Sequence, residues 1–489
     1  MERRSLTDYG PLLFVIAFFY ALLVPALFQD GMFKDGVLYA AVSRNYAEGY
    51  GTFWNMHFSE TYFPEFHEQP PLLFFLQGMF FRALGNSIYT ERIYCLLVAI
   101  VNVVVVICCW NLLAPPEKTG AKTAWLPLLL WILMPVSFHM FTNNLEECTM
   151  TLFSMLAFCS ILKAILKSPK KNFRWLLAGF WLLAAGLTKG IQGMFLLSAP
   201  FWCWVVLRNG SFRQFLFRTF LIGCIPVLFV VVAWFTPVIH HSFALYFDAR
   251  YPKILTGESV TGQNRFHLLW ELFIDTILPV AVVLIFILSG RKHPAFRTEL
   301  QENKRLAFFI FVCAISGILP LMITLEQRGF YLNTAMPLLA IAGALIIKPV
   351  AIQCSQYIQT KKWFASLVTS IAVLTLGVSI TFTFLKAGTP KCDADKIATV
   401  HEVAAITGDN ILLSIDQSMH DDWSLMNYFE RHHHISLTHE GDARSHWLLL
   451  PKGTLVQAGF RPISLNSAVY DLYEKPDSLL LQHGNGLVH

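Results

Sequence analysis

The sequence predicts a polytopic membrane protein built mostly of α-helices, with a small α/β domain at its C-terminal end. Of its 489 residues, 55% are hydrophobic and 14% are charged, whereas a soluble domain carries about 25% charged residues. A soluble protein of this size needs more polar side chains to cover its surface. The composition therefore excludes a soluble enzyme, a disordered chain and a fibrous repeat.

Long apolar stretches are the second observation behind this fold class. A membrane-spanning helix needs about 20 predominantly apolar residues, and about eleven stretches reach or approach that length. We therefore predict about eleven transmembrane helices, within a range of roughly 10 to 13. The approximate stretches are 12–28, 93–113, 125–140, 148–162, 175–187, 191–207, 220–239, 272–288, 306–325, 330–347 and 363–385.

The connectors between these stretches alternate in charge, which predicts an orientation. The set that begins with Arg3 and Arg4 holds about 20 of the 37 Lys and Arg residues, and the alternate set is longer and sparsely charged. Cytoplasmic connectors are rich in Lys and Arg. The N-terminus is therefore predicted to be cytoplasmic, and an odd helix count places the C-terminal region outside. The same bias accounts for the net charge of +5, so we predict no nucleic-acid partner.

Three regions follow from this topology. We expect a transmembrane domain over 1–386, which contains a first external loop over 29–92, and an extracytoplasmic α/β domain over 387–489. The last region is polar and contains short runs typical of strands and a helix. The predicted strands are 410–415, 446–450 and 468–472, and the predicted helix is 422–431.

The first external loop begins with a candidate surface helix. Asp35 follows the first apolar stretch closely, and Leu38, Ala41 and Val42 come after it at helical spacing. This pattern predicts an amphipathic helix on the membrane surface that Asp35 opens. Asp is also a good helix N-cap, so a structural role for Asp35 stays open.

A second amphipathic helix is predicted over 72–84, opened by Pro70-Pro71. Glu68 and Gln69 come just before these prolines. Two surface helices with carboxylates at their starts are unusual in a channel loop. Glu68 is equally well explained as a solvated loop acid.

This order of features resembles the GT-C glycosyltransferases, in particular the protein O-mannosyltransferase and aminoarabinose-transferase branch. The segment NNLEECTMTLF resembles the family's acidic position at the outer start of the fourth membrane helix; Glu147 matches it, and Glu146 is expected to be a solvated loop acid. AAGLTKGIQGMFLL is similar to the family's Leu-Thr-Lys-Gly segment and carries Lys189. EQRGFYLNTAMPLLAIAGA resembles a late segment whose Arg and Tyr match Arg328 and Tyr331.

The resemblance covers about residues 10–350 and implies a GT-C type helical bundle. It also implies an enzyme of the bacterial inner membrane that moves a sugar from a polyprenyl-phosphate donor to a hydroxyl or phosphate group on a protein or cell-envelope glycolipid. The chain departs from the aminoarabinose branch at one point. That branch has Glu-Lys before Pro-Pro, whereas this chain has Glu68-Gln69, so one phosphate-binding lysine is missing.

The chemistry of such a transfer requires cations and a base. The leaving phosphate is negatively charged and needs cations to receive it, and Lys189 and Arg328 lie at the predicted outer ends of apolar helices. A snorkelling role for Lys189 and an anchoring role for Arg328 are the structural alternatives. Further candidates for the donor site are Tyr331, Arg250, Lys253 and Arg265.

The acceptor hydroxyl needs a base, and a carboxylate near the membrane surface can serve. Asp35 is the candidate, and a single displacement would invert the anomeric centre. Glu147 is the second catalytic candidate, which would orient the acceptor or hold Lys189 by an ion pair.

Two other function classes are compatible with the composition: a transporter or flippase of lipid-linked saccharides, and a non-catalytic assembly protein. Transporters place charges near the membrane midplane and often have repeated halves, whereas the candidate residues here lie at predicted outer helix ends. The run His432-His433-His434 raises the question of a metal. Adjacent residues of a helix point in different directions, so we predict no metal site; no cofactor, including a divalent cation, is implied.

Overall fold

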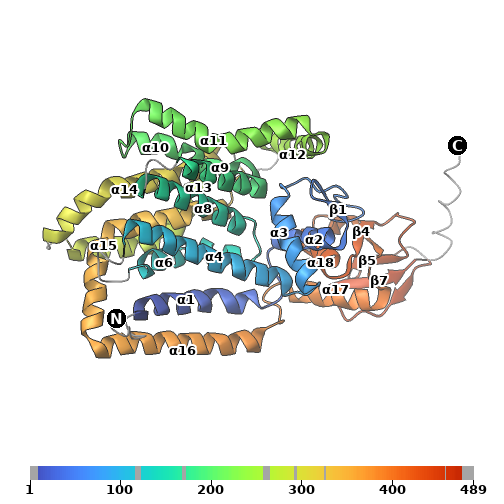
Figure 1. Ribbon diagram of the computed structural model, residues 1–489. Coiled ribbons are helices and arrows are strands. Elements are labelled where there is room, and N and C mark those ends of the chain that lie inside the picture. The colour runs from blue at the N-terminus through green and yellow to red at the C-terminus, as the bar shows by residue number, and fades with distance from the viewer. Residues whose placement is uncertain are drawn as a thin grey trace. The chain divides into compact units, whose positions relative to one another are not determined.

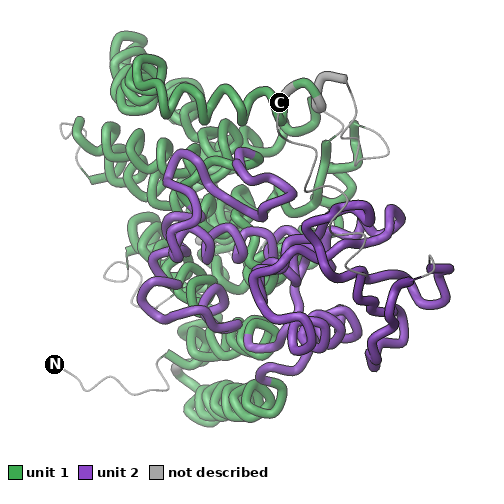
Figure 2. Tube along the Cα trace, turned by 90° about the vertical axis from the view of Figure 1, so that its right-hand side faces the viewer, with its two compact units in different colours: residues 1–27, 68–72, 93–386 green, residues 28–67, 73–92, 387–489 purple. Residues whose placement is uncertain are grey.

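The computed structural model is mostly helical, and it describes residues 9–115, 123–167, 172–256, 265–290, 294–323, 326–456 and 459–475. The chain forms two compact units, which Figure 2 shows in different colours. Unit 1 comprises residues 1–27, 68–72 and 93–386, and unit 2 comprises residues 28–67, 73–92 and 387–489.

Unit 1 consists of long apolar helices joined by short connectors (Figure 1). They are α1 (Gly10–Leu27), α4 (Thr90–Leu113), α6 (Trp125–Ile132), α7 (Pro135–Thr142), α8 (Glu147–Leu166), α9 (Phe173–Lys189), η2 (Gly190–Ser198), α10 (Ala199–Val205), α11 (Phe212–Phe235), α12 (Pro237–Thr256), α13 (His267–Gly290), α14 (Pro294–Ile318), η3 (Leu319–Ile323), η4 (Gly329–Ala335), α15 (Met336–Thr360) and α16 (Lys362–Lys386).

These helices make the chain a multi-pass membrane protein. In the described ranges, nine segments are long and apolar enough to cross a membrane, and the pair α6 and α7, bent by 78°, is a tenth candidate. Pro135 explains the bend, because proline lacks the N–H that would continue α6 and instead starts α7.

One of the nine segments, Phe173–Val205, contains a chain reversal. Gly190 has a φ of 81° and a ψ of −153°, which ends α9. A Cβ on Gly193 would lie 2.5 Å from the carbonyl oxygen of Ala185, whereas eight residues of straight helix would separate these positions by about 12 Å. The chain therefore turns back on α9, as the separate apolar stretches 175–187 and 191–207 predicted.

The outward faces of unit 1 are apolar. Helices α1 and α16 run side by side (Figure 1). The large side chains that are fully buried include Trp110, Trp131 and Phe158. By contrast, Phe235 on α11 is 79% exposed and Phe384 on α16 is 80% exposed. Contiguous apolar surface of this kind faces lipid rather than water.

Unit 2 combines two surface helices with a small sheet domain. α2 (Lys34–Glu48), the hairpin strands β1 (Gly51–Thr52) and β2 (Asn55–Met56), and α3 (Leu72–Leu84) come from the first loop. The C-terminal part contains α17 (Ala394–Thr407), β3 (Leu412–Ile415), η5 (Gln417–Met419), α18 (Trp423–His433), β4 (Ser436–His439), β5 (Trp447–Pro451), β6 (Arg461–Ile463) and β7 (Tyr470–Glu474). Its five strands have the order β4-β3-β5-β7-β6; β3 is parallel to β4 and β5, and the other pairs are antiparallel.

The first loop and the C-terminal region lie on the same side of the membrane. The backbone N–H of Asp30 donates to the carbonyl of Thr389 at 2.9 Å, and the N–H of Lys391 donates to the carbonyl of Asp30 at 2.9 Å. An even number of crossings must therefore separate these segments. Nine crossings in total satisfy this condition, and so do eleven if the bent pair and the reversal at Gly190 each add one; ten do not.

Candidate functional site

The strongest candidate site in unit 1 centres on Lys189, the last residue of α9. Its ammonium donates to Glu146 Oε1 at 2.7 Å and to Glu147 Oε1 at 2.5 Å. The carboxylate side chains are 0% and 1% exposed, and the lysine side chain is 6% exposed. Buried charges are costly even when paired, and within membrane helices they mark functional candidates.

The helix ends explain why these three charges meet. Glu147 is the first residue of α8, which packs against α9, so the start of α8 lies beside the end of α9. Carboxylates are favoured at a helix N-terminus and cations at a C-terminus. Gly190 allows the turn that follows Lys189, and a Cβ there would lie 2.5 Å from the hydroxyl of Tyr246.

An aromatic and acidic layer surrounds the ammonium. Lys189 Nζ lies 4.8 Å from the ring centroid of Tyr331, within cation–π range. The hydroxyl of Tyr331 donates to Glu326 Oε1 at 3.0 Å, and Arg250 Nη1 lies 3.4 Å from the same oxygen. The structure thus brings together four predicted site residues of unit 1: Lys189, Glu147, Tyr331 and Arg250.

The charges around Lys189 are not balanced one for one. Two carboxylates share one ammonium, and buried like charges raise the free energy of ionising both. Glu147 Oε2 is also buried without a hydrogen-bond partner among the described residues. A buried acceptor without a donor is unfavourable by about 1–3 kcal/mol, so the cluster is not optimised for stability.

Arg328 is a predicted cation that is accessible to a ligand. It is exposed, and its guanidinium has no hydrogen-bond or ion-pair partner in the described part of the chain. The side chain of Arg250 is 25% exposed. Arg265 is exposed, and its backbone carbonyl accepts a hydrogen bond from Gln327 Nε2 at 3.0 Å. Lys253 lies in α12, and its side chain is outside the described part of the structure.

Asp35 lies in unit 2, in the first turn of α2, and is half-buried. The N-cap of α2 is Phe33, with no side-chain cap hydrogen bond, so Asp35 is not the N-cap residue. Helix α18 holds the start of α2: Asn427 Nδ2 donates to the carbonyl of Lys34 at 2.9 Å, and the N–H of Met32 donates to the hydroxyl of Tyr428 at 3.1 Å. The C-terminal domain therefore positions the helix that carries Asp35.

Glu68 and Gln69 lie just before α3. Glu68 is half-buried, and Gln69 is buried with its Oε1 lacking a hydrogen-bond partner among the residues described. The helix that follows spans Leu72–Leu84, the range predicted from Pro70-Pro71.

Two acids of this region were not identified from the sequence as members of the site. The expectation that Glu146 is a solvated loop acid is wrong, because Glu146 is 0% exposed and bonded to Lys189. Two consecutive side chains at a helix start can converge on one long lysine, which helical spacing alone does not indicate. Glu326 contacts Tyr331 and Arg250. It lies two residues before Arg328, in the segment that resembles the family, and this position could have identified it as a site residue.

A cavity of about 930 Å³ lies in unit 1, apart from the cluster around Lys189. Its lining comes mostly from apolar residues of α13, α14 and α15, and it includes none of the predicted site residues. Its charged residues, Arg208, Lys304 and Arg305, belong to connectors predicted to be cytoplasmic. The lining suits a lipid chain rather than a reacting group.

Comparison with known proteins agrees with this architecture. Residues 68–240 match the family model of dolichyl-phosphate-mannose-protein mannosyltransferases. The matched region contains Glu68, Glu147 and Lys189. No curated protein sequence matches the chain significantly.

Solved structures match over nearly the whole chain. ArnT from Cupriavidus metallidurans bound to undecaprenyl phosphate is 15% identical, with a TM-score of 0.66 over 97% of this chain and 99% of that chain. The archaeal oligosaccharyltransferase AglB from Archaeoglobus fulgidus, in complex with an inhibitory peptide and a dolichol-phosphate, is 10% identical, with a TM-score of 0.52 over 91% of this chain and 69% of that chain. At these identities the likeness establishes the fold. The predicted GT-C type fold and the resemblance to this group of glycosyltransferases are confirmed.

Proposed function

We propose that the chain is an integral membrane glycosyltransferase that moves a sugar from a polyprenyl-phosphate donor to a hydroxyl acceptor. The observation that carries the proposal is the buried, unbalanced cluster of Glu146, Lys189 and Glu147 at helix ends of a GT-C type fold. Such a cluster is a poor stabilising device. It is well suited to orient polar ligands in a low-dielectric site.

The donor class is supported by the relatives and by the cations. The ArnT structure holds undecaprenyl phosphate and the AglB structure holds a dolichol-phosphate; both ligands are polyprenyl phosphates. Arg328 and the partly exposed Arg250 are suited to bind a phosphate by charge-assisted hydrogen bonds. Two of the three N–H groups of Lys189 are bonded to carboxylates. Lys189 can therefore offer one N–H group to the phosphate, and it also contacts the ring of Tyr331.

The reaction is a single displacement. The Asp35 carboxylate takes the proton of the acceptor hydroxyl as the acceptor oxygen attacks the anomeric carbon. The bond from that carbon to the phosphate oxygen breaks, and its electron pair leaves with the polyprenyl phosphate. The cations stabilise the charge that develops on this leaving group, and the configuration at the anomeric carbon is inverted.

Glu147 has an acceptor-orienting role in this scheme. One oxygen holds Lys189, and the other is buried without a hydrogen-bond partner among the described residues. A hydroxyl group of the acceptor molecule would donate a hydrogen bond to this oxygen. The acceptor class is a protein or a cell-envelope glycolipid.

We place the reaction at the outer face of a bacterial inner membrane, with the N-terminus in the cytoplasm. The positive connectors support this orientation. Reporter fusions in the 163–174 connector and at the C-terminus are expected to report opposite sides of the membrane. Equal signals from one side would contradict it.

The function is tested with purified protein reconstituted in lipid vesicles. Synthetic polyprenyl-phosphate sugars are supplied, and mass spectrometry follows both the lipid and candidate acceptors. The proposal predicts loss of donor with a matching gain of one sugar on the acceptor. Movement of the intact donor between leaflets without sugar transfer would instead identify a flippase.

A further inference from the structure

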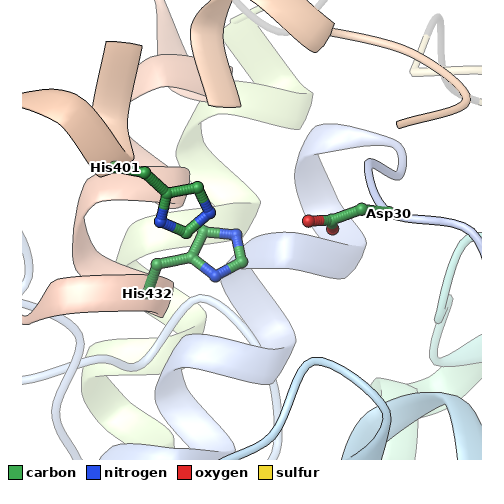
Figure 3. A group of neighbouring side chains, drawn as sticks. All are labelled: Asp30, His401 and His432. Atoms are coloured by element: carbon green, nitrogen blue, oxygen red, sulfur yellow. The ribbon is translucent and has the colours of Figure 1, made fainter. Parts of the chain in front are cut away.

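Three side chains that are distant in sequence meet in unit 2 (Figure 3). Asp30 follows α1, His401 lies on α17 and His432 lies on α18. One potential ligand atom from each of the three lies within 4.8 Å of the others. Figure 3 shows the carboxylate of Asp30 directed toward the two imidazole rings.

The surrounding contacts hold these groups in place. Asp30 Oδ1 accepts hydrogen bonds from the N–H of Gly31 at 2.7 Å and from Arg92 Nη2 at 3.0 Å. In the described part of the chain no hydrogen-bond partner is assigned to Oδ2. The ring of His432 stacks on that of Tyr428, with centroids 5.9 Å apart and 12° between the planes.

His401 is oriented by a relay of hydrogen bonds. Its Nδ1 lies 2.8 Å from His433 Nε2, and His433 Nδ1 lies 2.7 Å from Asp409 Oδ1. With His433 donating to Asp409, its Nε2 accepts from His401 Nδ1–H, which leaves His401 Nε2 as a lone-pair donor. Histidine ligands of metals typically donate their other ring N–H in this way.

We propose that Asp30, His401 and His432 bind a divalent transition-metal ion, with Zn²⁺ as the expected ion and water in the fourth position. Two imidazoles and one carboxylate are ligands that Zn²⁺ takes at about 2.0–2.2 Å. An ion central to three atoms at most 4.8 Å apart lies about 2.8 Å or less from each. Side-chain movements of less than about 1 Å therefore bring the three ligand atoms to bonding distance from the ion.

The protonation states are compatible with this ligand set. Burial lowers the pKa of His401, and the neighbouring His433 lowers it further. Burial also lowers the pKa of His432, with Arg431 adding to the effect. Both rings are therefore neutral at pH 7, as metal ligation requires. Arg92 is close to the site, but its bond is to Oδ1 of Asp30.

Such a metal would connect the first loop to the C-terminal domain. Asp30 lies between α1 and α2, and the histidines belong to the two helices of the C-terminal domain. Binding would add a third link to the backbone pairing of Asp30 with Thr389 and Lys391. The inference is independent of the proposed sugar transfer.

The test uses full-length protein without a histidine tag, purified in detergent and stripped of metal with a chelator. Zinc is then titrated from buffers of defined free Zn²⁺ concentration, and bound zinc is counted per chain. We expect one tightly bound ion, and His401→Gln should weaken its binding at least about tenfold. His401 is exposed, so this variant should fold. His446→Gln is the matched control, an exposed histidine of the same domain outside the cluster.

A second variant and a second readout make the result decisive. Asp30→Asn keeps an oxygen for Gly31 but loses the anionic ligand and the ion pair with Arg92. It should weaken zinc binding and lower stability, so zinc is counted on the folded fraction isolated by size-exclusion chromatography. Zinc should raise the unfolding temperature of the wild type and of His446→Gln but not of His401→Gln. The absence of tight zinc binding by the wild type, unchanged affinity in His401→Gln, or equal loss in His446→Gln would overturn the proposal.

Discussion

The two units contain buried charges of different design. In unit 2, Arg431 pairs with Glu91 at 2.7 Å and Arg92 pairs with Asp30 at 3.0 Å, one cation to one carboxylate in each case. In unit 1, two carboxylates share Lys189. The pairs of unit 2 join the first loop or its end to distant parts of the same unit. Balanced pairs therefore hold segments together, whereas the unbalanced cluster is the candidate for chemistry.

The largest expected effect compares one substitution in the two units. Glu91 and Glu147 are both buried acids in the first turn of a helix, and each is bonded to one cation. Glu91→Gln leaves Arg431 without its charged partner and should destabilise the protein by about 3–5 kcal/mol. Glu147→Gln leaves Lys189 paired with Glu146 and should change stability by less than about 1 kcal/mol.

Both variants lose the same favourable interaction with a helix N-terminus, about 0.3–1 kcal/mol, so the difference between them isolates the pairing. Denaturation in matched detergent, followed by circular dichroism and by tryptophan fluorescence, measures it. Equal destabilisation of the two variants would show that Glu147 is an ordinary structural partner.

The next effect concerns Arg328, one of the exposed cations of unit 1. Arg328→Ala should weaken binding of a polyprenyl-phosphate donor by roughly tenfold to a hundredfold, because it removes a charged hydrogen bond worth about 1.5–3 kcal/mol. Its stability should change by less than about 0.5 kcal/mol. Arg213→Ala, an exposed arginine of α11, is the control. Titration with fluorescent donor analogue gives both affinities, and identical values for the two variants would remove Arg328 from the donor site.

The smallest effect is an acid sensitivity of unit 2. Hydrogen bonds from Arg444 and Thr438 hold the pKa of Asp442 well below its usual range. A carboxylate with a lowered folded pKa stabilises the protein above its unfolded pKa of about 3.9 and loses this contribution as the pH falls further. The unfolding temperature of Asp442→Asn should therefore decline less than that of the wild type between about pH 5 and pH 3. Parallel declines would contradict this assignment.

The fold was predictable where local pattern determines structure. Pro70-Pro71 and the apolar spacing after them predicted the helix Leu72–Leu84, and the strand runs predicted β3, β5 and β7. The strand Arg461–Ile463 has only three residues, one of them proline, so its sequence is too short to show the alternation that predicts a strand. Helix α17 was not recognised either.

The site was predictable only in part, because its contacts are distant in sequence. Local segments identified Glu147 and Lys189, but the ion pair between Arg250 and Glu326 joins residues 76 positions apart. One sequence contains no signal for such a pair. The same holds for Asp30, His401 and His432: the histidine run was visible, but the carboxylate that faces it belongs to another part of the chain.

Asp35→Asn tests the central claim, an enzymatic sugar transfer with Asp35 as base, most directly. Asn cannot accept the proton, so transfer should fall by about a hundredfold or more. Asp395→Asn is the matched control, because Asp395 also lies in the first turn of a helix of unit 2 and each change removes about 0.3–1 kcal/mol of helix-dipole interaction. With donor binding and stability verified in both variants, the account predicts that only Asp35→Asn loses turnover. A folded Asp35→Asn protein that transfers sugar at the wild-type rate would contradict it.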